Sequence, residues 1–328
     1  MFDWGKLLKY DPIPLLLGSN NPSIIHFTKR DLLKEDTGPA KILWGQQYAT
    51  RLLLKQRVDG SWRYPGKRSG EKYGQDYNQL ETYRNLTQLV ELYEITRDHP
   101  AILQASEYLF TKQTLEGDFR GIYSAQYTPN YTAAIIETLI KAGYSGDERV
   151  KAGFRWLASE RQVDGGWAIP IRTSGHKIFK ALTSTSVVTG DRTKPSSHMV
   201  TGVVLRAFAA HEEYRRSIVA RDAGVLLRDS LFQKDIYPDR ASIDYWTKFT
   251  YPFWFTDLLS ALDSLSRIGF TLDDEEISAG LSWFTKKQNN DGGWRLSLLK
   301  NKSIPDLDNW VTLAICRVFT RFYENLES

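Results

Sequence analysis

Cysteine is nearly absent from this chain of 328 residues, and its scarcity already limits the chemistry. The single Cys316 forms no internal disulfide, and no group of thiols exists to hold structural zinc or an iron–sulfur centre. An excess of charge of one sign is also missing, because 43 Lys and Arg stand against 39 Asp and Glu, a net charge of +4. The composition therefore gives no electrostatic reason to expect a nucleic-acid partner.

Long hydrophobic runs are lacking too. Residues 12–18 and 202–210 are the longest, and both fall short of the roughly 18 to 20 residues of a membrane-spanning helix. The first ten residues place Asp3, Lys6 and Lys9 among apolar ones, which is unlike the continuous apolar core of a signal peptide. We therefore expect a cytoplasmic protein, while contact of a surface patch with lipid stays open.

What the chain does have is an ordinary folded composition with many aromatic residues. Hydrophobic residues make up 41% and charged residues 25%, which excludes a disordered or collagen-like chain. The aromatic set comprises 10 Trp, 17 Tyr and 15 Phe. The length allows either two domains or one large one.

An internal repeat organises the sequence. Four segments start with Gln, continue through Asp or Glu and Gly, and end with Trp or Phe: Gln56 to Trp62, Gln113 to Phe119, Gln162 to Trp167 and Gln288 to Trp294. The glutamines are 57, 49 and 126 residues apart, and the last interval suggests an eroded copy near residues 227–237. Periods of this length indicate a repeat architecture rather than two unrelated domains.

The stretches between these segments have helical spacing. Ala134, Ile135, Thr138 and Leu139 fall on one helical face, and the Gly residues of each repeat supply the positive φ that ends a helix. No stretch alternates in the manner of a strand. The sequence thus predicts an all-α fold of five or six helical hairpins, which either extend as a solenoid or close into a ring.

The repeated segments resemble the QW repeats of the squalene cyclase and protein prenyltransferase β-subunit superfamily, over about residues 41–328. The resemblance implies an α/α toroid, in which inner helices line a central cavity and outer helices are joined by the QW turns. Trp62, Trp167 and Trp294 would then lie in the outer tier. Residues 1–40 would form an entry segment packed on the single toroid domain of residues 41–328.

The metal chemistry of that superfamily does not carry over. The zinc site of prenyltransferase β-subunits contains an Asp-x-Cys pair, whereas Cys316 has no Asp two residues before it, and the related lanthionine cyclases need two Cys ligands. Cys316 lies in an apolar helical run and is expected to be a small buried hydrophobe. The five histidines show no pair at metal-ligand spacing. We expect neither a metal site nor a cofactor.

One acidic segment of the sequence nearly matches a catalytic motif. Class II terpenoid cyclases carry Asp-x-Asp-Asp at the start of an inner helix, and here Asp306 and Asp308 are followed by Asn309. The resemblance implies that Asp308 would protonate an alkene, with Asp306 as its partner. The alternative is that both residues only start a helix, because Asp and Asn are favoured N-cap residues. Residues 273–276, also acidic, match the start of an outer helix.

The starts of the proposed inner helices are rich in aromatic residues, which would converge on one end of the toroid. We predict that they form an aromatic collar that binds the substrate by apolar contact or cation–π attraction, with His198 as its one imidazole. Each aromatic could equally serve plain packing, and His198 could be a first-turn residue bonded to the backbone. The predicted collar consists of Tyr77, Tyr127, Tyr131, Tyr251, Trp254 and Trp310, together with His198.

Residues 168–195 form the longest insertion between repeats and are locally basic. Arg172 and Lys177 are candidates to meet an anionic head group such as a diphosphate, if this segment covers the ring as a lid. A solvated loop without such a role is the alternative. No phosphate-binding glycine motif occurs, so nucleotide binding has no support.

Three functional hypotheses follow. The first is a metal-free terpene cyclase or isomerase that uses Asp308. The second is a binding protein for an isoprenoid or another apolar ligand in the same cavity, and the third is a protein-interaction scaffold built on the same ring. Whether the chain is an enzyme, and its oligomeric state, stay open at this point.

Overall fold

The computed structural model describes residues 3–66, 74–299 and 304–327. Regular structure in these ranges is helical, and extended pairing is limited to isolated bridges, which confirms the predicted all-α class. In the same ranges no helix is both long and apolar enough to cross a membrane. The α-helices are α1 (Ile13–Leu17), α2 (Pro22–Phe27), α3 (Gln47–Leu53), α4 (Tyr77–Tyr93), α5 (Pro100–Phe110), α6 (Pro129–Leu139), α7 (Glu148–Ser159), α8 (Pro170–Thr173), α9 (Ile178–Thr183), α10 (His198–Ala210), α11 (Ile218–Asp229), α12 (Leu258–Arg267), α13 (Glu275–Lys287) and α14 (Leu307–Glu327).

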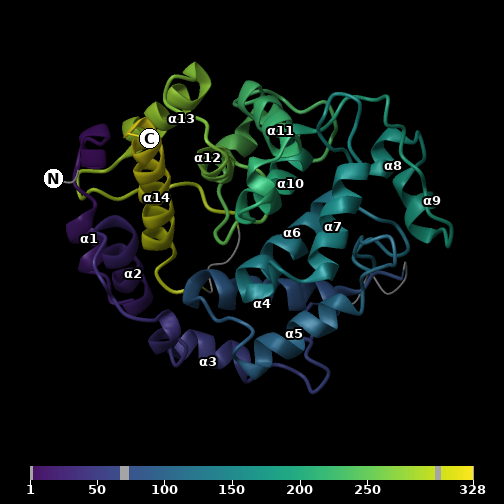
Figure 1. The fold of residues 1–328 in the computed structure, drawn as a ribbon, viewed down its shortest axis with the longest axis horizontal. Coiled ribbons are helices and arrows are strands. Elements are labelled where there is room, and N and C mark those ends of the chain that lie inside the picture. Colours follow the sequence, from purple (N-terminus) through teal and green to yellow (C-terminus); the bar gives the residue numbers. More distant parts are fainter. Residues whose placement is uncertain (1–2, 67–73, 300–303, 328) are drawn as a thin grey trace.

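The helices form a closed ring of two tiers. In the inner tier, α4, α6, α10, α12 and α14 each contact the next, and α14 returns to α4 through α2 and the short 3-10 turn Ala40–Leu43. In the outer tier, α5, α7, α11 and α13 each pack on the inner helix that precedes them, and α1 packs on α14. Figure 1 shows α1, α3, α5, α11 and α13 round the edge of this ring. The helices therefore close into a ring and do not extend as an open solenoid.

The glutamine of each repeat ties one outer helix to the next. Gln56 Nε2 donates to Gly60 O at 2.9 Å and to Ala101 O, at the start of α5, at 2.8 Å. Gln113 repeats the pattern on Arg149 O at the start of α7. Gly60 has φ +82°, and a Cβ there would come within 2.3 Å of the α5 backbone, so only glycine permits this close approach.

The aromatic residue that ends each repeat is buried between the tiers. Trp62 Nε1 donates to Leu52 O in α3, and its backbone N–H donates to Thr82 Oγ1 in α4. Trp167 and Trp294 make the same two bonds in their own units. The tryptophans are therefore anchored to the outer helices, as expected, but their side chains are buried.

The described part of the N-terminal segment packs against the last repeat and α14. The last repeat glutamine, Gln288, donates to Tyr10 O at 2.9 Å, just before α1, where the other repeats meet an outer helix. Gly292 lies against the backbone of Asp11 in the same manner as Gly60 lies against α5. Residues 3–32 thus occupy the place of a further unit between α14 and α3.

Residues 227–237, the predicted eroded repeat, include the end of α11 and the segment after it. Here a carboxylate bonds back to the inner helix of the same hairpin: Asp235 Oδ2 accepts from Ser197 Oγ at 2.7 Å and from Met199 N at 3.0 Å, at the start of α10. Asp235 is buried.

Charged side chains form a network near the C-terminal ends of the inner helices. Lys141 bridges Glu91 and Glu137, and Arg206 Nε donates to Glu137 Oε2 at 3.0 Å. Burial alone would raise the pKa of Glu137, but the charges of Lys141 and Arg206 outweigh it and lower that pKa. The network joins the C-terminal parts of α4, α6 and α10.

Candidate functional site

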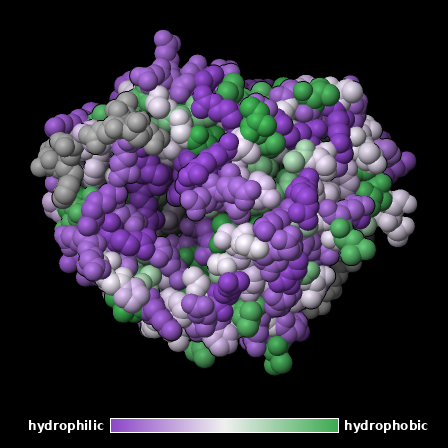
Figure 2. Space-filling model, in the orientation of Figure 1, coloured by the Kyte–Doolittle hydropathy of each residue, from purple (hydrophilic) through white to green (hydrophobic). Residues whose placement is uncertain are grey.

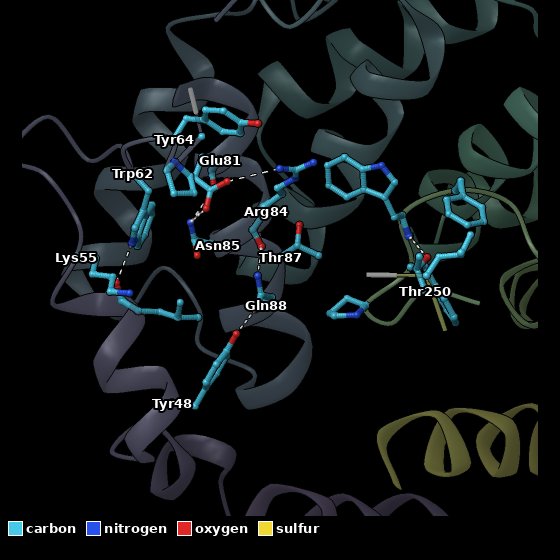
Figure 3. Close-up of a pocket in the computed structure, with 18 of the residues that line it drawn as sticks. Tyr48, Lys55, Trp62, Tyr64, Glu81, Arg84, Asn85, Thr87, Gln88 and Thr250 are labelled. Atoms are coloured by element: carbon cyan, nitrogen blue, oxygen red, sulfur yellow. Dashed lines mark hydrogen bonds and ion pairs between the residues drawn. The ribbon is translucent and has the colours of Figure 1, made fainter. Parts of the chain in front are cut away.

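A cavity of about 1320 Å³ lies against the middle of α4, at residues 81–88. One wall is formed by the end of α3, residues 62–66 and α4, and the facing wall by residues 240–255 together with Leu299. Figure 2 shows this face of the molecule hollowed, with mostly hydrophilic residues round the opening. Figure 3 shows the side chains that project into the space from both walls.

The charge of the cavity lining is strongly one-sided. Five cationic side chains stand against one carboxylate, that of Glu81. Arg84 approaches Glu81 to 3.6 Å, whereas no carboxylate of the described residues forms an ion pair with the other four. Such a lining attracts an anion. The five cations are Arg51, Lys55, Arg63, Arg84 and Arg240.

One face of α4 supplies the polar groups of the first wall. Glu81, Arg84, Asn85 and Gln88 follow the i, i+3, i+4, i+7 spacing that places residues on one helical face. Asn85 Nδ2 donates to Glu81 Oε1 at 3.2 Å, and Gln88 Oε1 accepts from Tyr48 OH at 2.6 Å (Figure 3). These bonds fix the side chains, so the wall is organised in the absence of a ligand.

The facing wall carries aromatic rings that contact two of the arginines, Arg84 from α4 and Arg240 from the facing wall itself. The guanidinium of Arg84 lies 4.6 Å from the ring centre of Trp254, and that of Arg240 lies 4.1 Å from the ring centre of Phe255. Cation–π contacts of this kind hold a guanidinium in place without consuming its charge. Both arginines therefore keep hydrogen-bond donors for an anion.

Residues 250–257 carry this wall and are held at both ends. Asp257 Oδ2 accepts from Thr250 N at 3.3 Å and its Oδ1 from Ser260 N at 2.8 Å, at the start of α12. Arg206 Nη1 donates to Phe255 O at 3.3 Å. Burial raises the pKa of Asp257 to about 7, although these hydrogen bonds and Arg206 oppose the rise.

A smaller pocket of about 120 Å³ adjoins the cavity and shares Arg240, Trp254 and Phe255 with it. Tyr83 and Tyr131 line it, and their ring centres lie 5.3 Å and 6.4 Å from that of Trp254. Trp254 therefore stands between the two spaces. Met199, Val200, Val203 and Ile169 supply aliphatic surface.

Two residues of the predicted collar line these spaces. Trp254 lines both, and Tyr131 lines the smaller one. Tyr77 does not line them but contacts the cavity-lining Tyr64, with tilted rings whose centres lie 4.9 Å apart. The structure thus places only part of the collar at the cavity.

The other collar aromatics are packed away from both spaces. Tyr127 makes an edge contact with Trp156 of α7, and burial raises its pKa to about 12. Tyr251 stacks on the fully buried Trp310, with ring centres 6.1 Å apart, and burial also raises its pKa to about 12. These contacts agree with the packing alternative.

His198 begins α10 and stacks on Trp246, with ring centres 5.3 Å apart. Its Nε2 lies 3.7 Å from Asp235 Oδ2, and burial lowers its pKa although Asp235 opposes this. It lines neither space. His198 therefore lies in the first turn of α10, which is the position that the structural alternative gave it.

The two candidate cations of the insertion, Arg172 and Lys177, have different surroundings. Arg172, in α8, forms a two-pronged ion pair with Asp239, a residue of the smaller pocket. Lys177 is exposed and precedes α9. Neither lines the cavity, so in this structure the insertion presents no cation to an anion bound there.

The two candidate acids lie at the start of α14. Asp306 is exposed, with φ +59°, and its carboxylate accepts from Ser19 Oγ and from Asn309 Nδ2. Asp308 is exposed in the first turn of α14. Neither lines the cavity or the smaller pocket, and the catalytic role of Asp308 stays a prediction.

Metal ligands and the cysteine can be placed as well. In the part of the chain that the structure describes, no group of three or more His, Cys, Asp or Glu is arranged to hold a metal ion. Cys316 is buried in α14, and burial raises the pKa of its thiol, which suits a hydrophobic packing role.

The cavity cations are the functional candidates that the sequence did not single out. Their charges occur among 43 basic residues of similar appearance, and they come from α3, α4 and two loops. One local signal was present: the α4 spacing of Glu81, Arg84, Asn85 and Gln88 gives a polar face on an inner helix.

Comparisons with known proteins give weak similarities only. No family model matches the chain, and no curated protein matches it significantly. Among solved structures, the apo form of the type II terpene cyclase MstE from Scytonema gives a TM-score of 0.38 at 14% identity, covering 84% of this chain and 96% of that chain. An MstE variant in complex with geranylgeranyl dihydroxybenzoate gives 0.38 at 14%, with coverages of 85% and 95%.

A protein from Actinoplanes gives a TM-score of 0.30 at 14% identity, covering 83% of this chain and 96% of that chain. Similarities at this level carry no argument about what the present chain binds or catalyses.

Proposed function

We propose that this protein binds an amphiphilic anion, with a phosphate-type head and an isoprenoid or similar apolar chain, in the central cavity of the ring. The observation that carries the proposal is the cavity lining, in which five cations face one carboxylate beside a set of aromatic rings. Its volume of about 1320 Å³ lies above the ~300 to 1,000 Å³ of common small-molecule sites, so a long ligand fits.

The cavity cations without a carboxylate partner indicate the head group of the ligand. Arg51, Lys55 and Arg63 have no carboxylate partner among the described residues, and all three are exposed. A bound anion with several oxygens could accept hydrogen bonds from more than one of them, and guanidinium groups suit phosphate oxygens in particular.

The aromatic rings on the opposite side of the cavity indicate the apolar chain of the ligand. Phe253, Trp254, Phe255 and Tyr245 offer ring faces to an apolar ligand, and such surface gains free energy when it is removed from water. The resemblance of the repeats to those of isoprenoid-binding proteins makes an isoprenoid the first chain to test.

The test is a titration of the protein with farnesyl diphosphate and with farnesol, without added metal, by isothermal calorimetry. The variant Arg51→Gln/Lys55→Gln removes two cavity cations, and Lys286→Gln removes an exposed cation of α13 as the matched control. We expect farnesyl diphosphate to bind about 10-fold or more weakly to the double variant, because charge-assisted hydrogen bonds are lost, and equally well to the control. Farnesol binding should not distinguish the three proteins.

Two results would overturn the proposal. Absence of farnesyl diphosphate binding to the unmodified protein would remove the anionic isoprenoid as ligand. Equal weakening by the cavity variant and by Lys286→Gln would show that general surface charge, rather than the cavity, attracts the diphosphate.

A further inference from the structure

The insertion of residues 168–195 is fixed to the ring by one buried side chain. Gln126, which is 2% exposed, donates from its Nε2 to Ala181 O and to Ser186 O, both at 3.0 Å. Its Oε1 accepts from Val188 N at 2.8 Å. Because these bonds hold the insertion at α9 and just after it, the surface that this part of the chain presents to solvent is well defined.

Helix α9 has two different faces. Ile178, Ala181 and Leu182 pack on the core of the ring. Phe179 and Lys180 lie on the opposite, outward face, where Phe179 is 62% exposed. Figure 1 places α9 at the outer edge of the molecule, beyond α7. The outward face thus carries an aromatic ring in contact with water.

A second apolar side chain adjoins this face. Because Gln126 bonds both Ala181 O and Ser186 O, the segment after α9 runs beside the helix, and Val187 is exposed there. Isolated apolar residues are common on protein surfaces, so their surroundings decide whether they indicate a partner.

The charges round Phe179 all have the same sign. Lys177 and Lys180 are exposed, and no carboxylate of the described residues forms an ion pair with either. Residues 165–190 contain neither Asp nor Glu. The outward face of α9 therefore combines an exposed ring with positive charge that no neighbouring acid of this segment balances.

The exposed apolar residues of the QW turns have acidic neighbours instead. Val58, Leu115 and Val163 are exposed at equivalent places in three turns. Each is followed directly in the chain by Asp or Glu. Because a carboxylate opposes contact with an anionic surface, these residues lack the combination that α9 has.

We propose that the outward face of α9 docks on a lipid bilayer that contains anionic phospholipids. Phe179 inserts among the head groups, and Lys177 and Lys180 lie beside lipid phosphates. Aromatic and basic residues on one helical face suit this surface, because the ring leaves water and the negative surface potential attracts the ammonium groups. A ring at the edge of the molecule enters such a deformable surface without the complementary pocket that a folded partner would have to supply.

The docking face is separate from the proposed ligand site. Phe179, Lys177 and Lys180 line neither the cavity nor the smaller pocket. The inference therefore does not rest on the proposed function, and the two fail separately. Docking would bring the protein to the phase in which an amphiphile with a long apolar chain accumulates.

The test is co-sedimentation of the unmodified protein with vesicles of phosphatidylcholine alone and of phosphatidylcholine mixed with phosphatidylglycerol. We expect binding to the anionic vesicles to be about 10-fold tighter or more, because each lysine near an anionic surface is worth about 5-fold. High salt should remove this preference. No binding to the anionic vesicles, or equal binding to both kinds, overturns the proposal.

The ring is tested by Phe179→Ser against Leu115→Ser, since both side chains are exposed but only Phe179 lies on α9. We expect Phe179→Ser to weaken binding to the anionic vesicles by about 10-fold, and Leu115→Ser to leave it unchanged. Farnesyl diphosphate titrations should not distinguish these two variants from the unmodified protein. Equal vesicle binding by the two variants would contradict the insertion of Phe179.

The lysines are tested by Lys177→Gln/Lys180→Gln against Lys286→Gln/Lys287→Gln, an exposed pair in the last turn of α13. Both double variants change the net charge equally. Only the α9 pair should weaken binding to the anionic vesicles, by about 10-fold or more. This comparison stays decisive even if Phe179→Ser lowers the melting temperature. An equal effect of both pairs would show that net charge, rather than α9, attracts the protein, and would overturn the proposal.

A label reports directly which face meets the bilayer. Because Cys316 is buried, an environment-sensitive fluorophore can be attached selectively through Phe179→Cys or, as the control, through Leu115→Cys. We expect the emission of the label at residue 179 to shift to the blue on addition of anionic vesicles, and that at residue 115 to stay unchanged. Sedimentation without a shift at residue 179 would show that another face docks. Vesicle binding through α9 without farnesyl diphosphate binding keeps this inference and removes the proposed function.

Discussion

Gln288 and Tyr10, which are 278 residues apart in the chain, are joined by two hydrogen bonds. Gln288 Nε2 donates to Tyr10 O at 2.9 Å, and Gln288 Oε1 accepts from Tyr10 N at 3.1 Å and also from Lys9 N at 3.0 Å. The same glutamine donates to Gly292 O within its own turn. One side chain thus closes the ring between the last repeat and the first helix.

Replacing Gln288 with Ala should open this closure first. We expect a loss of roughly 1 to 3 kcal/mol in the free energy of unfolding, because partly buried backbone groups of residues 9 and 10 lose their partners. Limited proteolysis should cut within residues 1–40 faster in the variant. Gln56→Ala, which breaks an internal link of the ring, is the matched control and should not expose the N-terminal segment. Equal cutting in both variants would contradict the closing role of Gln288.

Trp254→Ala tests the boundary between the two spaces. Trp254 is half-buried and lines both, so its truncation should weaken farnesyl diphosphate binding while costing less stability than the roughly 3 to 5 kcal/mol of a fully buried Trp. Trp310→Ala is the comparison for stability, because Trp310 is fully buried and lines neither space. Chemical denaturation and calorimetry give the two quantities. Unchanged binding together with a stability loss as large as that of Trp310→Ala would show that Trp254 is a core residue.

The pH dependence of stability should reveal Asp257. Its pKa is raised by burial from 3.8 to about 7 in the folded chain, so the folded state holds a proton that the unfolded state releases between these values. Stability contributed by this site therefore falls as the pH rises from about 4 to about 7. Asp257→Asn, which keeps an N-cap residue at α12, should become more stable relative to the unmodified protein over that range.

Asp263 is a control, because its pKa shift has the opposite sign to that of Asp257. Burial opposes ionisation there, but Arg267 and Arg321 outweigh it and lower the pKa of Asp263. Asp263→Asn should therefore cost most at neutral pH, and its cost should shrink only under strongly acidic conditions. Urea unfolding at pH 5 and pH 8 measures both variants. A parallel pH response of the two variants would contradict these assignments.

Catalysis has its own test at Asp308. Incubation of the unmodified protein and of Asp308→Asn with squalene and with C15 to C20 prenyl diphosphates, without added metal, is followed by mass spectrometry. We expect binding without cyclised product, because Asp308 and Asp306 are exposed and line neither space. A cyclised product that disappears in Asp308→Asn would instead establish the cyclase.

Much of the fold could be predicted because its signal is local and repeated. Glycine at the close approach of two backbones, as at Gly60 and Gly292, and glutamine at the helix end recur in phase, so each copy supports the others. The sequence also held an unused signal: Thr82, Thr132, Thr201 and Thr312 recur at inner-helix starts. Each accepts a hydrogen bond from the backbone N–H of the aromatic residue that ends a repeat.

The site was harder to predict because its residues are not equivalent from unit to unit. The aromatic side chains at the inner-helix starts divide between packing, as for Tyr251 on Trp310, and lining, as for Trp254. Whether an aromatic side chain packs or lines the cavity depends on the rotation of its helix about its own axis and on the conformation of residues 250–257. The local spacing of residues in the sequence does not determine either of these. Free cations such as Arg240 are likewise recognised only once their partners in space are known.

The most direct test of the central claim is a crystal structure of the protein with a non-hydrolysable farnesyl diphosphate analogue. The account predicts density for the diphosphate within hydrogen-bond distance of cavity cations, with Arg51, Lys55 or Arg63 among them, and the chain against Trp254 and Phe253. A diphosphate bound elsewhere on the surface, with the cavity free of the analogue, would contradict it.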